Sequence, residues 1–447
     1  MSEAFSIFAA AKDAGDARAL DDGERVHSFA QLADKVRARL PALERSGRDG
    51  APHAVVGTNT LETLVTLYAL FESRIPALLL HPRLTAEEQR TLLATPGHSG
   101  AVDRDAAAIL YTSGTTGTPR AAVLTHSALA ASARASAANL GWRTDDCWLL
   151  CMPVARVGGL SILTRCLAAR RCVALLPRFD AAALPDAIRT RRASLVSMVP
   201  TMLARVLDAH PAWTGRESLR AIAVGGAAAS PRLLQRAAER RLPIIVTYGM
   251  TETCSQVTAT PYAARFEPAS TAAGAPLPGI DVRIVDHRIE VRGPVLMAGY
   301  WNEAPLAPNA WFDTGDVGEI DARGFLHVHA RRTDLIVTGG ENVYPAEVER
   351  VLEACPGIAG AAVFGLPDEV WGQTVAAVLV PNAARPSDAE LLDYVGARLA
   401  PYKRPRDVCY VASLPQTTAG KLDRSALAEY ATALKPLGRP PDREAQR

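Results

Sequence analysis

Short apolar runs alternate along this chain with longer stretches that mix Ala, Leu, Arg and Glu. Runs rich in Val, Ile and Leu lie at Ser194 to Val199, Arg220 to Val224 and Leu242 to Thr247. Buried parallel strands have this composition, and the mixed stretches between them are long enough to form helices. The alternation therefore predicts an α/β fold with buried parallel strands.

A glycine-rich turn follows the second of these runs. Gly225, Gly226 and Ala227 end the predicted strand, and Ser230 followed by Pro231 is typical of the N-cap and first residue of a helix. Ligands of open α/β sheets gather at the carboxyl ends of the strands. This turn is therefore a candidate binding edge.

The pattern changes after Gly274, where apolar and polar residues alternate one by one. Asp281 to Val285 and Ile289 to Val291 follow this alternation, and turns separate such segments, which predicts an antiparallel subdomain. A further unit, which contains both helices and strands, begins near Thr333. Its expected elements are helices at Pro345 to Ala354 and Asp388 to Leu399, and strands at Ala361 to Phe364 and Val375 to Val380.

These patterns predict a large N-terminal domain over residues 1–330 and a small α+β domain over residues 333–435. The end of the chain, residues 436–447, holds three prolines and five charged residues. Such a segment has too few apolar residues to pack, so we expect a disordered tail.

Composition narrows the functional classes. The 447 residues include 49 Lys and Arg against 47 Asp and Glu, a net charge of +2, so no general field attracts nucleic acid or an anionic membrane. Charges interrupt the longest apolar stretches well before the roughly 20 residues that span a bilayer. The first residues lack the basic segment and cleavage site of a secretory signal. We expect a cytoplasmic enzyme without a membrane span.

The cysteines do not form a recognisable framework. Their number is odd, and none are arranged as C-x-x-C, so neither a disulfide scaffold nor a zinc site is indicated. Cys147 and Cys151 lie in an apolar run, and we expect them to be core thiols. The seven cysteines are at positions 147, 151, 166, 172, 254, 355 and 409.

A loop rich in hydroxyls and glycine follows the apolar run Ala106 to Leu110. Its glycines let the backbone approach a ligand with N–H groups turned inward, and its short hydroxyls add neutral donors, so the loop is suited to phosphate. The G-x-x-x-x-G-K-[ST] loop and the G-x-G-x-x-G turn of other nucleotide-binding folds are absent from the sequence. The predicted phosphate ligands are Thr112, Ser113, Gly114, Thr115, Thr116, Gly117 and Arg120.

This loop resembles the phosphate loop of the adenylate-forming superfamily, which includes acyl-CoA synthetases, firefly luciferase and the adenylation domains of peptide synthetases. Later segments match the same family in the same order. The resemblance implies a large N-terminal domain with two α/β sheets and a small antiparallel β subdomain, followed by a small mobile α+β domain. The matching segments are Tyr248 to Thr253, Thr314-Gly315-Asp316, Arg331, Gly339 to Glu349, and Pro415 to Lys421.

The resemblance assigns nucleotide contacts to several of these residues. Tyr248 is expected to stack on adenine, with Gly226, Ala227, Gly249 and Met250 around it. Asp316 is expected to accept both ribose hydroxyls, for which an ionised carboxylate has two acceptor oxygens. Arg331 falls where the family places an arginine that also reaches the nucleotide.

The resemblance also implies which residues act in the chemistry. Thr251 bonds phosphate, and Glu252 supplies a carboxylate to Mg²⁺, an ion that prefers one or two carboxylates together with phosphate oxygens. Lys421 is the adenylation catalyst, because its ammonium neutralises the attacking carboxylate and the α-phosphate as charge develops. Gly339 and Gly340 are expected to let the pantetheine arm of CoA pass close to the backbone.

The chain departs from the family pattern at four places. Arg120-Ala121 replaces the usual Lys-Gly after the phosphate loop, and we expect Arg120 to keep phosphate binding through its charge. Ala330 replaces the glycine before Arg331. Thr333 occupies the hinge position that is usually Asp or Lys. Ala155-Arg156 replaces an aromatic residue and a histidine that border the acyl pocket.

Within the superfamily, the segments Tyr248 to Val257 and Arg331 to Glu349 most resemble the o-succinylbenzoate:CoA ligases of menaquinone biosynthesis. We hypothesise that Arg156 faces the acyl pocket and pairs with a second carboxylate of the acid, as a dicarboxylate requires. The alternative is a salt bridge of Arg156 at the pocket rim.

The expected activity is that of an AMP-forming acid–thiol ligase that uses ATP, Mg²⁺ and coenzyme A. One alternative is an aryl or fatty acid:CoA ligase, or a stand-alone adenylation enzyme that loads a carrier protein. Another is a non-catalytic nucleotide-binding homologue, with Arg120, Ala121, Ala155 and Thr333 as marks of decay. The sequence does not determine the acid, nor whether the protein forms a homodimer.

Overall fold

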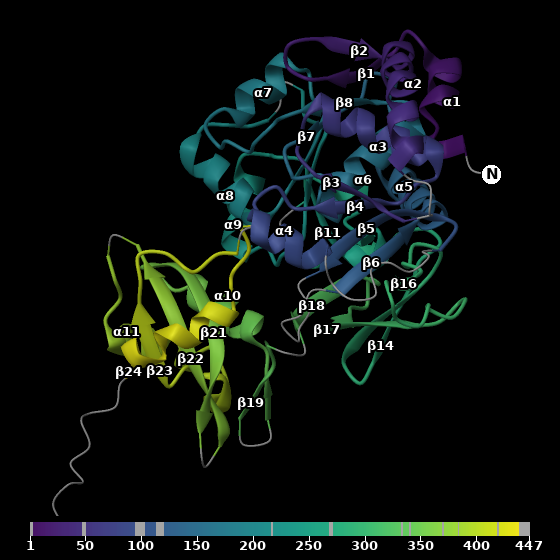
Figure 1. Cartoon of the computed structure of the whole chain (residues 1–447). Coiled ribbons are helices and arrows are strands. Elements are labelled where there is room, and N and C mark those ends of the chain that lie inside the picture. The colour runs from purple at the N-terminus through teal and green to yellow at the C-terminus, as the bar shows by residue number, and fades with distance from the viewer. Residues whose placement is uncertain are drawn as a thin grey trace, which may run out of the picture.

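The computed structural model describes residues 3–46, 51–93, 103–112, 120–215, 218–267, 271–331, 334–338, 341–368, 371–382, 384–417 and 420–437. The chain up to β18 (Leu326–Arg331) builds a large body, and the chain from β19 (Ile336–Thr338) onward builds a smaller one beside it (Figure 1). This division agrees with the predicted large and small domains.

The largest sheet has a parallel centre with antiparallel strands at its margins. The strand order is β13-β12-β11-β10-β9-β7-β8-β1-β2, and β11, β10, β9, β7, β8 and β1 run parallel. The strands are β1 (Arg18–Asp21), β2 (Val26–Ser28), β7 (Cys147–Leu150), β8 (Cys172–Leu175), β9 (Leu195–Met198), β10 (Ala221–Val224), β11 (Ile244–Met250), β12 (Ser255–Ala259) and β13 (Ala275–Pro276).

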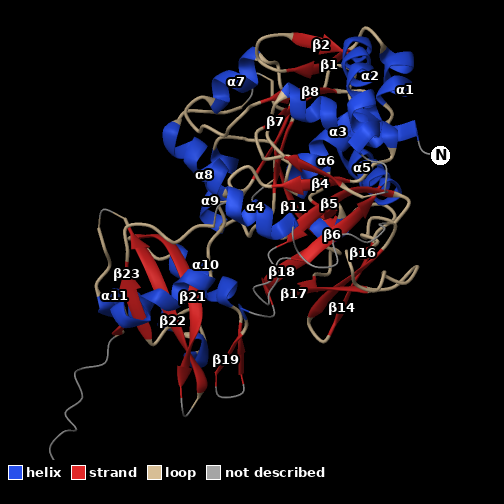
Figure 2. Ribbon diagram, viewed as in Figure 1, coloured by secondary structure: helices blue, strands red, loops and turns tan. Residues whose placement is uncertain are grey.

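Two further sheets complete the large body (Figure 2). One has the order β16-β6-β5-β4-β3, formed by β3 (His53–Val56), β4 (Ala77–Leu80), β5 (Ala106–Thr112), β6 (Arg120–Thr125) and β16 (Gly299–Tyr300). The other is antiparallel, in the region where the alternation predicted such a subdomain. It consists of β14 (Asp281–Val285), β15 (Arg288–Arg292), β17 (Phe312–Ile320) and β18.

Helices cover both faces of the largest sheet. One core packs Leu67, Leu129 and Leu163 of α3, α5 and α6 against both Leu110 of β5 and Leu150 of β7, so these helices lie between two sheets. A second core packs helices α7, α8 and α9 on the opposite face. The helices of this body are α1 (Ile7–Ala14), α2 (Phe29–Ser46), α3 (Leu61–Ser73), α4 (Ala86–Leu93), α5 (His126–Leu140), α6 (Val157–Ala169), α7 (Leu184–Thr190), α8 (Pro200–Ala209) and α9 (Pro231–Glu239), with short 3₁₀ turns η1 (Glu3–Phe5), η2 (Thr251–Thr253) and η3 (Tyr262–Ala264).

The smaller body has a core of its own, in which Val348 and Leu352 of α10 pack with Val363 of β21. Its sheet has the order β20-β19-β22-β23-β24, with β21 also paired to β22. The remaining elements are β20 (Glu341–Val343), α10 (Pro345–Glu353), β21 (Ile358–Asp368), β22 (Gly372–Pro381), α11 (Asp388–Gly396), η5 (Pro401–Lys403), β23 (Asp407–Tyr410), η6 (Ser425–Ala433) and β24 (Lys435–Pro436).

Two polar devices hold the loops of the large body. The side-chain amide of Asn59 donates to the carbonyls of Leu150 and Met152 and accepts from the N–H of Val154, which fixes the loop before α6. At the other end of the strands, the buried guanidinium of Arg220 forms a bidentate pair with Asp146. Buried charges are tolerated when they are paired and hydrogen-bonded in this way.

The structure corrects two details of the sequence prediction. β11 continues to Met250, so Tyr248 and Gly249 lie within the strand, because pairing with β12 extends it. The predicted tail begins too early: Pro436 pairs with Asp407, and Leu437 is buried in the core of the smaller body. Residues 438–447 lie outside the described residues. All seven cysteines are buried and unbridged, as expected.

Within the described ranges, none of the helices has both the length and the apolar character needed to cross a membrane.

Candidate active site

The carboxyl ends of β9, β10 and β11 form the edge that the sequence predicted as a binding site. A side chain at Gly225 would place its Cβ 2.3 Å from Thr247 Oγ1, and Gly226 has a φ of +79°. Only glycine avoids the close contact at position 225 and adopts the positive φ at position 226 without strain. Ser230 caps α9 by accepting from the N–H of Leu233, as predicted.

Tyr248 and Asp316 meet at this edge from two different sheets. The Tyr248 hydroxyl donates to Asp316 Oδ2 at 2.7 Å, and Asp316 is buried. The backbone of Arg331 lies opposite Asp316 in the β17–β18 pair. At Gly249 a Cβ would come within 1.6 Å of the Ser255 carbonyl oxygen, so the strand requires glycine beside Tyr248. The segments predicted to hold adenine and ribose are therefore adjacent.

Glu252 lies at the centre of a second polar cluster. It belongs to η2, directly after β11, and its buried carboxylate accepts a hydrogen bond of 2.8 Å from the Tyr300 hydroxyl. The Arg120 guanidinium stacks on the Tyr300 ring, with 3.5 Å between its Cζ and the ring centroid, and forms a bidentate pair with Glu303. The four side chains form one network, which we call the Glu252 cluster.

Charge and burial keep the donors of this cluster protonated. Burial, together with the neighbouring Glu252 carboxylate, raises the pKa of Tyr300 well above its ordinary value. The hydrogen bonds to Glu303 raise the pKa of Arg120. Tyr300 therefore remains a hydrogen-bond donor to Glu252 throughout the physiological pH range.

The predicted phosphate loop is described only at its two ends. Thr112 and Arg120 pair across β5 and β6, and the Thr112 hydroxyl donates to the Arg120 carbonyl at 3.3 Å. Ser113, Gly114, Thr115, Thr116 and Gly117 lie outside the described residues. The Arg120 guanidinium is held by Glu303 and Tyr300, so its predicted direct contact with phosphate gains no support from this geometry.

Lys421 sits on a short turn that reaches the large body. The turn is closed by hydrogen bonds from the Gly420 N–H to the Thr417 carbonyl and from the Thr417 N–H to the Lys421 carbonyl. A Cβ built on Gly226 would lie 3.8 Å from Lys421 Nζ. Lys421 and the Gly225–Gly226 turn, about 200 residues apart in the sequence, therefore meet at the same edge.

Arg156 is the N-cap residue of α6 and is half-buried beside His81. Its Nε is buried without a hydrogen-bond partner among the described residues. Burial lowers the pKa of Arg156, and burial together with the Arg156 and Arg83 charges lowers the pKa of His81 to about 4. Whether Arg156 faces the acid or forms a salt bridge at the pocket rim stays a prediction.

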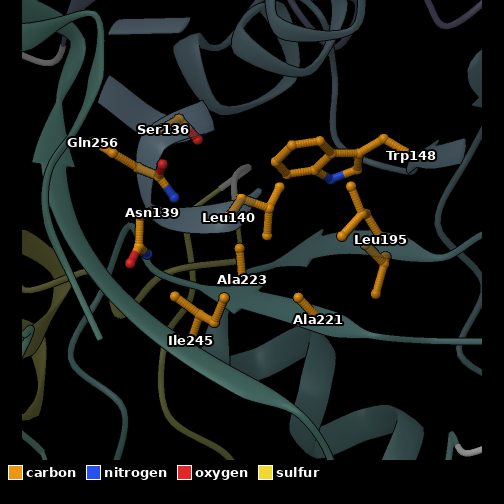
Figure 3. A pocket seen from close by; sticks show the side chains of 10 residues that line it. Ser136, Asn139, Leu140, Trp148, Leu195, Ala221, Ala223, Ile245 and Gln256 are labelled. Atoms are coloured by element: carbon orange, nitrogen blue, oxygen red, sulfur yellow. The ribbon is translucent and has the colours of Figure 1, made fainter. Parts of the chain in front are cut away.

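The same helix carries a second buried cation that the sequence reasoning missed. Arg165 is 3% exposed, and its Nε and one terminal nitrogen lack hydrogen-bond partners among the described residues. Burial lowers its pKa to about 10. Its Cζ lies 5.8 Å from the ring centroid of Trp148, a residue that lines an internal cavity (Figure 3).

This cavity lies between α5 and the face of the sheet that carries Ala223 and Ile245. Figure 3 shows that Ser136 and Asn139 from α5 and Gln256 from β12 border it alongside those apolar side chains. Ala223 and Ile245 precede Gly225 and Thr247 by two residues each along β10 and β11. The cavity therefore lies one step inside the sheet from the predicted catalytic edge. It combines an apolar wall with several polar groups.

Several predicted residues cannot be placed. Gly339, Gly340 and Thr333 lie outside the described residues, although the flanking Thr338 and Glu341 pair with each other. Other residues at the site carried no sequence signal. Tyr300 and Glu303 are isolated polar side chains, and only an alignment of related sequences could have marked them.

Comparison with known proteins agrees with this geometry. Residues 95–301 match the AMP-binding enzyme family, and residues 347–421 match the AMP-binding enzyme C-terminal domain. The 2-succinylbenzoate–CoA ligase of Bacillus cereus is 35% identical over 462 residues, which cover 93% of this chain and 95% of that protein. The chain belongs to the AMP-binding family of adenylate-forming enzymes.

Solved structures of this AMP-binding family share the whole fold. The o-succinylbenzoate CoA synthetase of Bacillus subtilis, in complex with its acyl-adenylate intermediate, superimposes with a TM-score of 0.84 at 32% identity, over 94% of this chain and 97% of that one. Its complex with ATP and magnesium also gives 0.84 at 32% identity, over 94% of this chain and 98% of that one. A double mutant of that enzyme bound to a product analogue gives 0.69 at 32% identity, over 96% and 99% of the two chains.

One prediction concerns the Glu252 cluster. Replacing Tyr300 by Phe removes a hydrogen bond to a charged acceptor while preserving the ring beneath Arg120, so the Mg²⁺ concentration for half-maximal acid activation should rise by about 10-fold. A Mg²⁺ titration of pyrophosphate release measures this shift. Tyr402→Phe, at an exposed tyrosine, is the control; an equal shift in both variants would contradict the role of Tyr300.

Proposed function

We propose that this protein is an ATP-dependent acid:CoA ligase whose acid is 2-succinylbenzoate. The observation that carries the catalytic part is the position of Lys421 Nζ beside Gly226, at the edge that also holds the Tyr248–Asp316 pair. A cation, a stacking ring and a buried carboxylate at one edge suit a nucleotide whose α-phosphate is attacked there. The identity of the acid rests on the relatives and on the half-buried Arg156 at the start of α6.

The nucleotide would lie along this edge. Tyr248 offers an aromatic face for adenine, and the Asp316 carboxylate offers acceptor oxygens for the ribose hydroxyls. Thr251, the first residue of η2, would donate to phosphate. The segments on both sides of residues 113–119 form the β5–β6 hairpin, so that loop starts and ends beside the Glu252 cluster, where the β- and γ-phosphates would be bound.

Glu252 fits the magnesium ion that this family implies. Mg²⁺ is usually held by one or two carboxylates together with substrate phosphates and water. Glu252 is a buried carboxylate with one oxygen bonded to Tyr300, so the other is available to a cation. When bound, the ion would disperse the negative charge of the triphosphate.

The first step forms a bond between a carboxylate oxygen of the acid and the α-phosphorus of ATP, while the bond from that phosphorus to the bridging oxygen breaks and pyrophosphate leaves. Two anions must approach each other, so the barrier is largely electrostatic. The Lys421 ammonium offsets both charges, and no side-chain nucleophile takes part. Asp316 and Tyr248 contribute by holding the nucleotide in line.

In the second step the CoA thiol attacks the acyl carbon, the carbon–oxygen bond to the phosphate breaks, and AMP leaves. Lys421 occupies the edge that the thiol must approach, so the small domain would rotate about Thr333 and bring Gly339 and Gly340 to the site. The TM-scores against the Bacillus subtilis enzyme, 0.84 for the ATP complex and 0.69 for the product-analogue complex, support two domain arrangements, with this structure in the adenylating one.

Arg156 supports an acid with a second carboxylate. Its Nε is buried without a hydrogen-bond partner in the described part of the chain. Burying a cation is costly unless an anion accompanies it. A dicarboxylate would supply that anion, whereas a fatty acid or a simple benzoate would leave Arg156 uncompensated.

Replacing Arg156 by Ala should lower kcat/KM for 2-succinylbenzoate by roughly 10- to 100-fold, the range expected for losing a charged hydrogen bond in a partly buried site. The same change should have little effect on benzoate, which has no second carboxylate. The measurement compares kcat/KM for both acids in the wild type and the variant. Equal losses on the two acids would contradict the assignment.

The proposed function is tested by incubating the protein with ATP, Mg²⁺ and a panel of 2-succinylbenzoate, benzoate, succinate and octanoate, with and without CoA. Of the four acids, we expect only 2-succinylbenzoate to give pyrophosphate release and acyl-AMP, detected by mass spectrometry. A thioester should form only when CoA is also present. Activation of another acid would replace the named substrate. The absence of acyl-AMP with every acid would refute catalysis.

A further inference from the structure

A hydrogen bond joins the Lys421 turn to the large body. The Thr201 hydroxyl donates to the Gly420 carbonyl oxygen at 2.7 Å. Thr201 is the second residue of α8 and follows the carboxyl end of β9. The bond connects residues 219 positions apart and crosses between the two bodies of the chain.

The contact is specific to the residue that precedes the predicted catalyst. Gly420 has a φ of +74°, and a Cβ built on it would lie 3.3 Å from Thr201 Oγ1. The left-handed backbone that glycine permits therefore turns the carbonyl toward Thr201 and sends the Lys421 side chain toward Gly226. Because β9 and β10 are adjacent parallel strands, Thr201 and Gly226 mark two neighbouring points of one edge.

Several hydrogen bonds within the Lys421 turn give it its shape. The Lys421 N–H lies 3.3 Å from Thr417 Oγ1, Gln416 and Leu422 form a β-bridge, and the Asp423 N–H donates to the Pro415 carbonyl. These bonds give the turn its shape but do not place it against the large body. Elsewhere the contacts between the two bodies include a hydrogen bond of 2.9 Å from the Arg232 guanidinium to the Ile358 carbonyl and the ring pair of His329 and Tyr344.

We propose that Thr201 is a positioning residue for adenylation: its hydroxyl anchors the Gly420 carbonyl and thereby sets the Lys421 ammonium at the reacting phosphate. This inference rests on the proposed function and adds a residue to it. Since Lys421 must leave the site before the thiol attacks, the contact belongs to the first half-reaction only. A single neutral hydrogen bond is also weak enough to be broken in every cycle.

The test compares Thr201→Val, which keeps the side-chain shape without the donor, with Thr201→Ser, which keeps the donor. Rapid-quench measurements follow acyl-AMP formation from acid and ATP, and separately thioester formation from supplied acyl-AMP and CoA. We expect Thr201→Val to slow the first reaction by roughly 3- to 12-fold, the value of one neutral hydrogen bond, and to leave the second unchanged. Thr201→Ser should restore most of the rate.

Thr190→Val is the matched control, because the exposed Thr190 hydroxyl bonds only to carbonyls of its own helix α7. It should change neither half-reaction. A merely structural role of Thr201 would slow both half-reactions together, and this outcome, or a wild-type rate of adenylation in Thr201→Val, would overturn the proposal.

A readout that needs no acid separates this proposal from the proposed function. Spin labels at Ala209→Cys and Glu429→Cys, both exposed positions, report the distance between the two bodies by double electron–electron resonance in the presence of ATP. The seven native cysteines are buried and should not be labelled. Thr201→Val should reduce the population at the docked distance even if no acid of the panel is activated; an unchanged population would overturn the role of Thr201.

Discussion

Lys421→Ala should lower the rate of acyl-adenylate formation by about 10³-fold, the scale on which loss of a preorganised charge-stabilising group slows a reaction. The expected loss follows from the position of the Lys421 ammonium. Lys421 Nζ lies beside Gly226, and in the adenylating arrangement the approach of two anions depends on that ammonium. Thioester formation from supplied acyl-AMP should retain nearly the wild-type rate, since in the proposed mechanism the second half-reaction takes place after Lys421 has withdrawn.

The measurement is a pair of single-turnover assays, one for each half-reaction. Lys435→Ala is the control, because Lys435 is an exposed lysine of the same small domain, on β24, and should affect neither half. If Lys421→Ala slowed both half-reactions by the same factor, the account in which one edge serves two arrangements of the domains would be wrong.

Glu252→Gln should lower acid activation by about 10²-fold at fixed Mg²⁺, because the change removes the charge of the carboxylate proposed to hold the ion while leaving its shape and a hydrogen-bond acceptor for Tyr300. The effect should be partly recovered at high Mg²⁺. It should exceed that of Tyr300→Phe, since Tyr300 acts on the ion only through Glu252.

A second readout avoids dependence on turnover. Mn²⁺ in place of Mg²⁺ allows the affinity of the metal for the enzyme–ATP complex to be followed by electron paramagnetic resonance, and Glu252→Gln should weaken it. Glu239→Gln, at an exposed glutamate at the end of α9, serves as control. Unchanged Mn²⁺ affinity in Glu252→Gln would remove Glu252 from the metal site.

The Glu252 cluster gives the Arg120 substitution a structural meaning. Arg120 keeps the positive charge of the family's lysine, and its planar guanidinium forms a bidentate pair with Glu303 while stacking on Tyr300. A lysine ammonium has no planar fork to make both contacts. In this chain the residue after the predicted phosphate loop, Arg120, therefore stacks on the ring whose hydroxyl bonds to Glu252, and its charge is paired with Glu303.

The fold class could be predicted from the sequence because it depends on patterns that repeat over many residues. The apolar runs at 194–199 and 220–224 became β9 and β10, and the alternation over 281–285 became β14 with the same bounds. Ser230 and Pro231 marked the start of α9 through local capping chemistry. The extent of β11 was missed, because Tyr248 to Met250 are held in the strand by antiparallel pairing with β12 and not by an apolar run of their own.

The sequence by itself determined the candidate site residues that short motifs mark, such as Tyr248 to Glu252, Asp316 after its Thr-Gly turn, and Lys421 after its glycine. Only the tertiary structure decided which partners hold them. Tyr300, Glu303 and Thr201 reach Glu252, Arg120 and Gly420 across 48, 183 and 219 positions. A single polar side chain has no periodicity, so its role arises only when packing of apolar strands and helices brings it to its partner.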